Sequence, residues 1–146
     1  MSTLNTRTFA LVFGAIYALV GLIGFIPGLA TPPPPDAPGL TADTGYGYLF
    51  GLFPINTLHN LVHLVVGLAG IAAYTRMTYA RLYAQVVAVV FGLLTLMGLV
   101  PGLDTTFGLI PLFGHDVWLH ALTAAAAAYF GFARRPALAD AGRSRV

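Results

Sequence analysis

The chain has 146 residues, of which 58% are hydrophobic and only 8% are charged. An average soluble domain has about 25% charged residues, so a soluble protein of this composition could not cover its surface with polar groups. The formal charge of +2 is too small to indicate a nucleic-acid partner. The absence of cysteine excludes disulfides, thiolate metal sites and cysteine nucleophiles. The composition therefore predicts a protein whose solvent is largely lipid.

Four apolar stretches follow one another along the chain, each about long enough to cross a hydrocarbon core of ~30 Å as a helix. The first stretch loosely resembles a cleaved signal peptide, but it is long for one, and we expect it to remain in the mature protein. We predict an all-α membrane protein of four transmembrane helices in a compact bundle, forming one domain over residues 1–146. The predicted spans are 9–27, 57–74, 82–100 and 117–132, with outer loops at 28–56 and 101–116 and a tail at 133–146.

The basic residues predict how the chain is oriented. All seven are arginines, and they precede the first span, join the second to the third, or follow the fourth: Arg7, Arg76, Arg81, Arg134, Arg135, Arg143 and Arg145. The two opposite loops contain aspartate but no arginine. Cytoplasmic loops of membrane proteins carry an excess of Lys and Arg. We therefore expect both termini on the cytoplasmic side of a bacterial inner membrane, plasma or photosynthetic.

The first outer loop has two distinct parts. Residues 32–35 are four consecutive prolines, which favour an extended polyproline segment. Residues 45–53 are rich in aromatic residues and glycine. This second part either lies along the outer interface, with Tyr46, Tyr48 and Trp118 at the headgroup level, or forms a lid over the helix ends. Both interpretations stay open at this point.

Two short glycine- and proline-containing motifs each occur twice, which predicts two tandem two-helix repeats. Residues 24–29 (GFIPGL) match residues 98–103 (GLVPGL), and residues 51–54 (GLFP) match residues 108–111 (GLIP). The second register aligns His63 with His120 and His59 with Asp116. Because each unit contains two spans, the copies would be related by an axis along the membrane normal.

Small residues recur at a spacing of three to four along the predicted helices. Lipid supplies no hydrophobic drive for helix association, so small residues at this spacing favour close backbone packing. The candidate packing residues are Gly14, Gly21, Gly24, Gly67, Gly70 and Gly98.

Histidines near the outer ends of the second and fourth spans are the candidate cofactor-binding residues: His63, His120 and His59. Three interpretations compete. The side chains hydrogen-bond across the bundle, ligate a cofactor or metal, or titrate as a proton or pH sensor. Two facing imidazoles suit a tetrapyrrole such as haem or chlorophyll, whereas Zn²⁺ needs a third or fourth ligand such as His59 or Asp116.

Motifs of known enzymes are absent from the sequence: it has no phosphate loop, nucleophile elbow, zincin helix or paired carboxylates. We therefore expect no enzyme and assign no catalytic residue. The middle of each predicted span lacks ionisable residues, which argues against an ion-coupled transporter.

One string carries a resemblance to a known family. Residues 51–56 (GLFPIN) lead into residues 59–64 (HNLVHL), and Asp116, Leu119 and His120 repeat part of this pattern. With the GFIPG motif of the first span, these residues resemble a bacterial family of small four-span membrane proteins classed as domain of unknown function 4383. The resemblance covers roughly residues 8–132 and implies fold and location. It supplies no reaction and transfers no site residue.

The expected function is that of an accessory or structural subunit of a larger membrane complex, photosynthetic or respiratory. The expected partners are the lipid bilayer and other membrane subunits or further copies of the chain, with no nucleic acid. The alternative is a stand-alone membrane redox protein that binds a tetrapyrrole or metal through His63 and His120.

Overall fold

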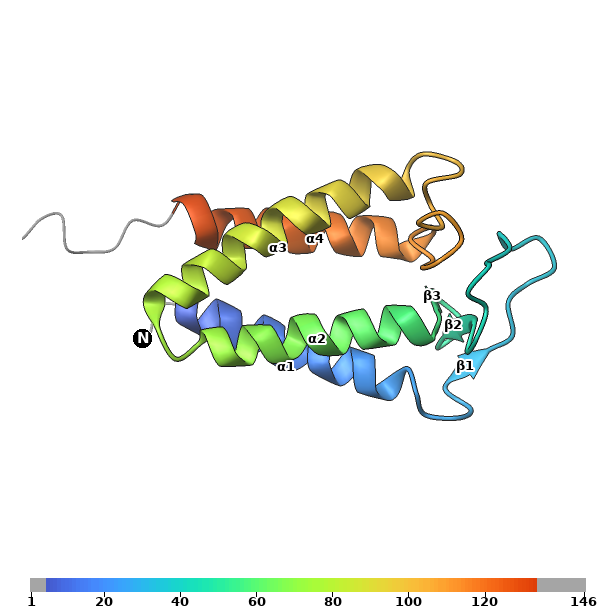
Figure 1. Cartoon of the computed structure of the whole chain (residues 1–146), viewed down its shortest axis with the longest axis horizontal. Helices are drawn as coiled ribbons and strands as arrows, with labels where there is room; N and C mark the ends of the chain where they lie inside the picture. Colours follow the sequence, from blue (N-terminus) through green and yellow to red (C-terminus); the bar gives the residue numbers. More distant parts are fainter. Residues whose placement is uncertain (1–4, 134–146) are drawn as a thin grey trace, which may run out of the picture.

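The computed structural model describes residues 5–133 of the chain. Its helices are α1 (Thr6–Ile23), α2 (Thr57–Ala73), α3 (Met77–Gly98) and α4 (His115–Ala128), and α4 continues into a π-helical turn, η1 (Tyr129–Ala133) (Figure 1). The four arginines that follow the fourth predicted span, and nearly all of the predicted tail, lie outside the described residues.

The helix bounds differ from the predicted spans by up to five residues at either end, and the first helix shows why. Helix α1 begins earlier than predicted because the Asn5 side chain accepts a hydrogen bond of 2.8 Å from Thr8 N and caps the first turn. It ends at Ile23, four residues before Pro27. A proline ring clashes with the carbonyl four residues earlier, so the predicted extension to Pro27 is wrong for a local reason.

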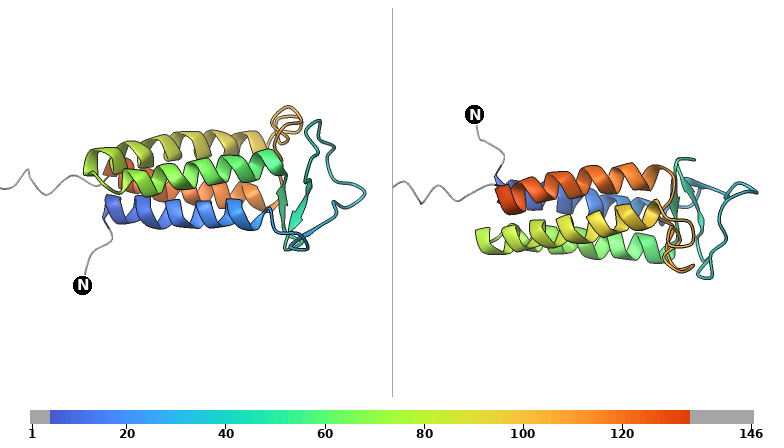
Figure 2. Two further views of the ribbon diagram at one scale, coloured as in Figure 1. Left: turned by 60° about the horizontal axis from the view of Figure 1, so that its bottom comes forward. Right: turned by 90° about the horizontal axis from the view of Figure 1, so that it is seen from above.

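The helices pack as two antiparallel pairs, α1 with α2 and α3 with α4, and the pairs lie side by side (Figures 1 and 2). Between them, aromatic residues and alanines form one buried core. Its largest members are Phe9, Tyr17, Tyr83, Val87 and Phe91.

The candidate packing glycines lie where two helices touch. A Cβ at Gly14 would lie 2.6 Å from the backbone nitrogen of Ile71, and one at Gly21 would lie 2.7 Å from the backbone oxygen of Asn60. Gly67 faces the backbone of Ala18. Gly24, Gly70 and Gly98 are equally crowded, against Asn60, Tyr83 and Leu112 respectively. These glycines therefore serve contacts inside the chain.

A small antiparallel sheet covers one end of the helices, and the sequence analysis did not predict it. Its strands are β1 (Ala30–Thr31), β2 (Gly47–Leu49) and β3 (Phe53–Ile55), in the order β1-β2-β3. Phe50 and Gly51 join β2 to β3 with φ of 54° and 72°, the left-handed pair that a tight hairpin requires. Leu49 and Ile55 are buried. Residues 45–53 thus form a lid over the helix ends, the second of the two interpretations.

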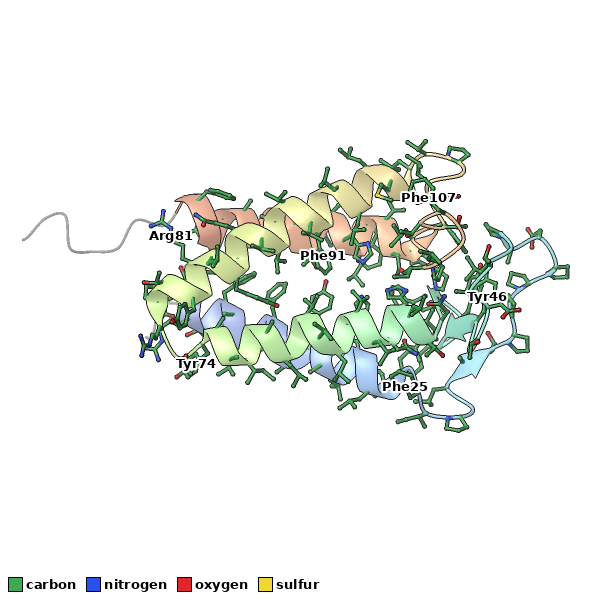
Figure 3. All side chains as sticks on the ribbon, viewed as in Figure 1. Phe25, Tyr46, Tyr74, Arg81, Phe91 and Phe107 are labelled. Atoms are coloured by element: carbon green, nitrogen blue, oxygen red, sulfur yellow. The ribbon has the colours of Figure 1, made fainter. Side chains whose placement is uncertain are left out.

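Charged residues separate along the long axis of the molecule. At one end, Arg7 Nε donates to Tyr74 O at 2.6 Å, and Arg81 Nε donates to Gly131 O at 3.0 Å. Figure 3 shows Tyr74 and Arg81 at the end opposite Tyr46. The acidic residues of the described part belong to the other end, in the two long connections and the first turn of α4: Asp36, Asp43, Asp104 and Asp116.

Two helices are long and apolar enough to cross a membrane. Helix α1 has 18 residues and α3 has 22, both with a mean hydropathy of 1.8 over the apolar window. Only 39% of that window is buried in α1 and 28% in α3. The core helix of a soluble protein would be mostly buried, whereas these two helices leave most of their apolar window exposed, as helices that face lipid do.

The backbone conformation is the same at several matching positions of the two halves. Gly28 and Gly102, each after its Pro-Gly motif, have φ of 87° and 88°. Left-handed φ values also recur at two matching pairs, residues 50 and 51 and residues 107 and 108. The following prolines, Pro54 and Pro111, are both fully buried. Duplication stays a prediction, and these matches support it.

Candidate metal centre

Three histidines converge at the end of the helices beneath the sheet. His59 and His63 lie one turn apart on α2, so both rings emerge from the same face, and His120 comes from α4. One nitrogen from each ring lies within 4.8 Å of the others. The closest pair is His59 Nε2 and His63 Nε2, at 3.1 Å. All three residues are at most 6% exposed.

Asp116 completes the cluster from the first turn of α4. Its Oδ2 atom lies 3.7 Å from His59 Nε2, and the side chain is buried. Asp116 and His120 are one turn apart, as are His59 and His63. Two helices thus present matched pairs of side chains to each other, at the positions that the sequence repeat aligns.

Several polar atoms of the cluster lack hydrogen-bond partners. The Nδ1 atoms of His63 and His120 and the Oδ2 atom of Asp116 are buried and unpaired. Each unpaired buried group costs roughly 1–3 kcal/mol. Asn60 Oδ1 and the Tyr83 hydroxyl, outside the cluster, are also buried without a partner, so it is the concentration of such atoms around the histidines that makes this cluster the candidate site for a ligand.

Two polar residues near the histidines, Thr123 and Asn60, do not pair with them. The Thr123 hydroxyl shares a hydrogen bond of 2.8 Å with the Tyr17 hydroxyl. Asn60 packs its side chain against Gly24 of α1, about a quarter turn around α2 from His59. Neither residue therefore serves the histidines as a hydrogen-bond partner.

Aromatic rings hold the imidazoles from two sides. The ring of Tyr17 meets that of His63 edge-on at 5.1 Å, and the ring of Phe91 meets that of His120 at 5.1 Å and 88°. Figure 3 shows Phe91 pointing from α3 into the interior. Nothing in the spacing of the histidines connected Tyr17 with the site. Only the repeat, which aligns Tyr17 with Phe91, could have indicated its position.

Two cavities adjoin the cluster. One of about 180 Å³ is lined by all three histidines and otherwise almost entirely by apolar side chains of α2, α3 and the second long connection. The other, of about 110 Å³, touches His59, His63 and Asp116 from the side of α1 and the sheet. The histidines therefore stand between two largely apolar spaces.

Two other polar residues of this end lie outside the cluster. Asn56 caps α2 by accepting from His59 N at 2.8 Å. His115 is exposed, and its Nδ1 accepts a hydrogen bond of 3.0 Å from Trp118 Nε1. His115 therefore shares the end of the molecule with the cluster but not its environment.

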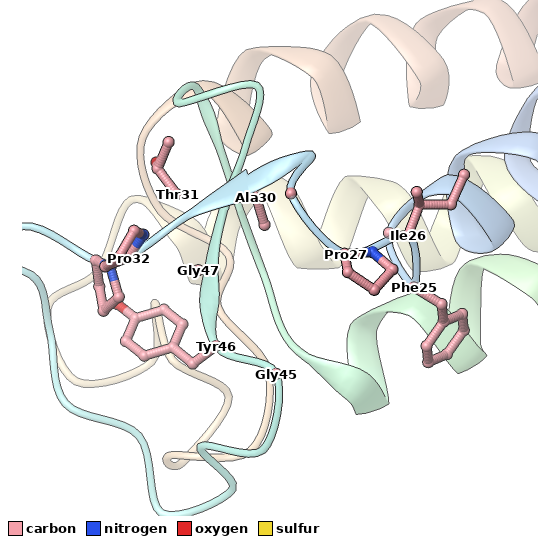
Figure 4. A pocket seen from close by; sticks show the side chains of 12 residues that line it. Phe25, Ile26, Pro27, Ala30, Thr31, Pro32, Gly45, Tyr46 and Gly47 are labelled. Carbon is pink, nitrogen blue, oxygen red and sulfur yellow. The ribbon is translucent and has the colours of Figure 1, made fainter.

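A separate groove of about 400 Å³ lies outside the helices, between the end of α1 and the strands (Figure 4). It is open and lined mainly by glycine, proline and backbone, with Phe25 and Tyr46 at its sides. The Tyr46 hydroxyl already donates to Pro38 O at 2.9 Å. The groove offers no group able to ligate a metal.

Fold and site together define a small helical protein with membrane-compatible helices and a buried histidine-aspartate cluster. The family model described as a domain of unknown function (DUF4383) matches residues 7–133, and the chain belongs to that family. The match spans all four helices and the whole cluster. No curated protein and no solved structure matches the chain.

Proposed function

We propose that the chain is a four-span membrane protein that binds one transition-metal ion through His59, His63 and His120, with Asp116 as a fourth ligand. The observation that carries the proposal is the convergence of three buried imidazoles, two of them with an unpaired Nδ1 atom, beside a carboxylate oxygen that has no hydrogen-bond partner.

Helix lengths support four spans. Helix α2 is apolar overall and has 17 residues, which makes it about 26 Å long at ~1.5 Å per residue. Helix α4 has 14 residues, and η1 continues it by five more, so the combined helical run approaches the length of α1. All four would then cross the ~30 Å core with modest thinning or tilt. The arginines at one end and aspartates at the other favour a cytoplasmic α2–α3 turn and an outer sheet.

The ligand distances suit a metal after a small adjustment. In a tetrahedral site with bonds of about 2.1 Å, neighbouring ligand nitrogens stand about 3.4 Å apart. His59 Nε2 and His63 Nε2 are already 3.1 Å apart, and one nitrogen from each of the three rings lies within 4.8 Å of the others. Reaching the tetrahedral spacing of about 3.4 Å therefore takes a movement of at most about 1.4 Å.

Donor chemistry limits the choice of ion. Imidazole is a suitable ligand for zinc, copper, iron and nickel. Because the chain has no cysteine, it cannot supply the thiolate ligands that favour Cu(I). One carboxylate cancels one positive charge of the ion, which lowers the cost of holding it away from water. A divalent first-row metal fits this set, and the chemistry supplied when it is bound would be that of a Lewis acid or a one-electron carrier.

A tetrapyrrole fits less well. Pockets for molecules of drug size occupy about 300–1,000 Å³. The cavity beside the histidines is about 180 Å³, so a haem or chlorophyll would require α2 and α3 to separate. We therefore favour a single ion over the macrocycle that the sequence also suggested.

An accessory role in a larger photosynthetic or respiratory complex stays a second proposal, and it is compatible with a metal site. The glycine faces do not support it, because they pack α1 against α2 and α3 against the second connection. Purification in a mild detergent tests it: partners at fixed stoichiometry would support it, and a chain that migrates alone would not.

Metal analysis of the purified protein tests the principal proposal. We expect one equivalent of metal per chain for the wild type and its loss in His63→Leu and His120→Leu. His115→Leu is the matched control, because this exposed histidine lies one residue before Asp116 yet outside the cluster. The proposal would be contradicted if the wild type held no metal after reconstitution with Zn²⁺ or Cu²⁺. It would also be contradicted if His115→Leu lost as much metal as the other two variants.

A further inference from the structure

The larger cavity beside the histidines places apolar space directly against the candidate metal ligands. All three imidazoles line it, together with Val66 of α2 and Leu94 of α3. Its lining is almost wholly apolar. A molecule inside this cavity would touch the metal on the side away from Asp116, which borders only the smaller cavity.

Side chains of α2 and α3 separate this cavity from the surroundings of the molecule. Val62 of α2 and Val90 of α3 both line it, and both are 43% exposed on the outside of the molecule. The wall between cavity and surroundings is therefore one side chain thick. In the proposed topology those surroundings are lipid, which excludes ions and concentrates uncharged apolar molecules.

The size and lining of the cavity define its occupant. An engineered apolar cavity of about 150 Å³ in another protein stays dry and binds benzene or xenon. At about 180 Å³, this cavity is of the same class. Apart from the imidazoles, which the proposed ion would engage, the only polar residue of the lining is Thr106, and its hydroxyl already donates to Ile110 O at 2.9 Å.

The loop that covers the cavity is held in a strained conformation. Thr106 and Phe107 have φ of 49° and 58°, a region that residues other than glycine seldom adopt. Strain of this kind concentrates at ligand clamps and active sites. Thr106 and Ile110 both face the cavity, so the strained turn shapes its outer wall.

We infer that this cavity binds a small uncharged apolar molecule, no larger than benzene, that arrives from the bilayer and contacts the metal ion. Dissolved dioxygen belongs to this class of molecule. The inference rests on the proposed metal site for the contact with the ion, whereas the binding of an apolar molecule depends only on the cavity.

Benzene is the probe for the cavity, with metal-free protein in deuterated detergent. We expect nuclear Overhauser effects between benzene and the methyl groups of Val66 and Leu94, saturating as benzene is added. Val66→Phe and Val90→Phe should abolish them by filling the space. Val12→Phe, on the exposed face of α1, is the matched control and should retain them. Contacts that persist in both filled variants, or never saturate, would overturn the inference.

Fluorobenzene then tests the contact with the ion. In protein loaded with Cu²⁺, we expect its fluorine relaxation to be much faster than in protein loaded with Zn²⁺, and Val66→Phe should remove the difference. If benzene contacts were seen but the protein took up no metal, the proposed metal site and the contact with the ion would be wrong, while the binding of an apolar molecule in the cavity would stand. Metal uptake without benzene contacts would defeat this inference alone. Equal fluorine relaxation in both loaded forms would place the molecule away from the ion.

Discussion

Asn56 links three parts of the chain through one side chain. Its Oδ1 caps α2, and its Nδ2 donates to Ala42 O at 2.8 Å and to Leu109 O at 2.6 Å. The two carbonyls belong to the two long connections, one in each half of the chain. This fully buried amide therefore fixes the start of α2, and with it the direction of His59, relative to both connections.

Replacement of Asn56 should reveal this role. We expect Asn56→Ala to lower the free energy of unfolding by about 2–4 kcal/mol, because a cap is worth about 1 kcal/mol and unpaired buried groups cost ~1–3 kcal/mol. Asn5→Ala is the control: Asn5 caps α1 at an exposed position and should cost only about 1 kcal/mol. Thermal unfolding in detergent measures both, and equal losses would argue against the link.

Part of the candidate site could be predicted from the spacing of individual residues in the sequence. His59 and His63 stand four apart in an apolar stretch, a spacing that places both on one helical face, and the repeat pointed to His120. Asp116 could be named from the sequence as a possible further zinc ligand, but its burial beside His59 could not, because an aspartate in a first helical turn also suits the helix dipole. Only the packing of α4 against α2 shows that this carboxylate faces His59.

At the scale of helices and strands, the apolar runs indicated all four helices, and their ends depended on local chemistry. Prolines at 27 and 101 stop the preceding helices within four residues, and Asn5 and Asn56 begin two others. The sheet was not predictable in the same way. Its strands are two or three residues long, too short for an alternating pattern to emerge.

Close packing of α1 on α2 gives a prediction at this scale. A methyl group at Gly14 would meet three backbone atoms of α2 within 2.8 Å, and backbone cannot yield as a side chain can. We expect Gly14→Ala to destabilise the fold by ~1–3 kcal/mol, the usual cost of overpacking. The melting temperature in detergent is the measurement.

The control for this substitution lies on α3. A Cβ at Gly92 would meet nothing within 4 Å, so Gly92→Ala should leave stability unchanged or raise it by up to ~1 kcal/mol through helix propensity. If the two variants melted alike, the α1–α2 contact would be looser than described and the glycine face would point to lipid.

On the scale of the whole molecule, the separation of charges predicts its orientation. The absence of cysteine allows single cysteines to be introduced without background. We expect Asp43→Cys to react with a membrane-impermeant maleimide from outside the cell, and Thr75→Cys, in the α2–α3 turn, to react only after the cytoplasm is opened. Labelling of both from the same side would contradict the four-span topology.

Metal coordination is the central claim, and X-ray absorption spectroscopy of the zinc-loaded protein tests it most directly. The account predicts three imidazoles and one oxygen at about 2.0–2.1 Å from the ion, with the outer-shell scattering of histidine rings. The His63→Leu variant should lose that signature, while His115→Leu should keep it. A spectrum of oxygen ligands alone, without imidazole scattering, would show that the zinc binds elsewhere and that the buried histidines do not hold it.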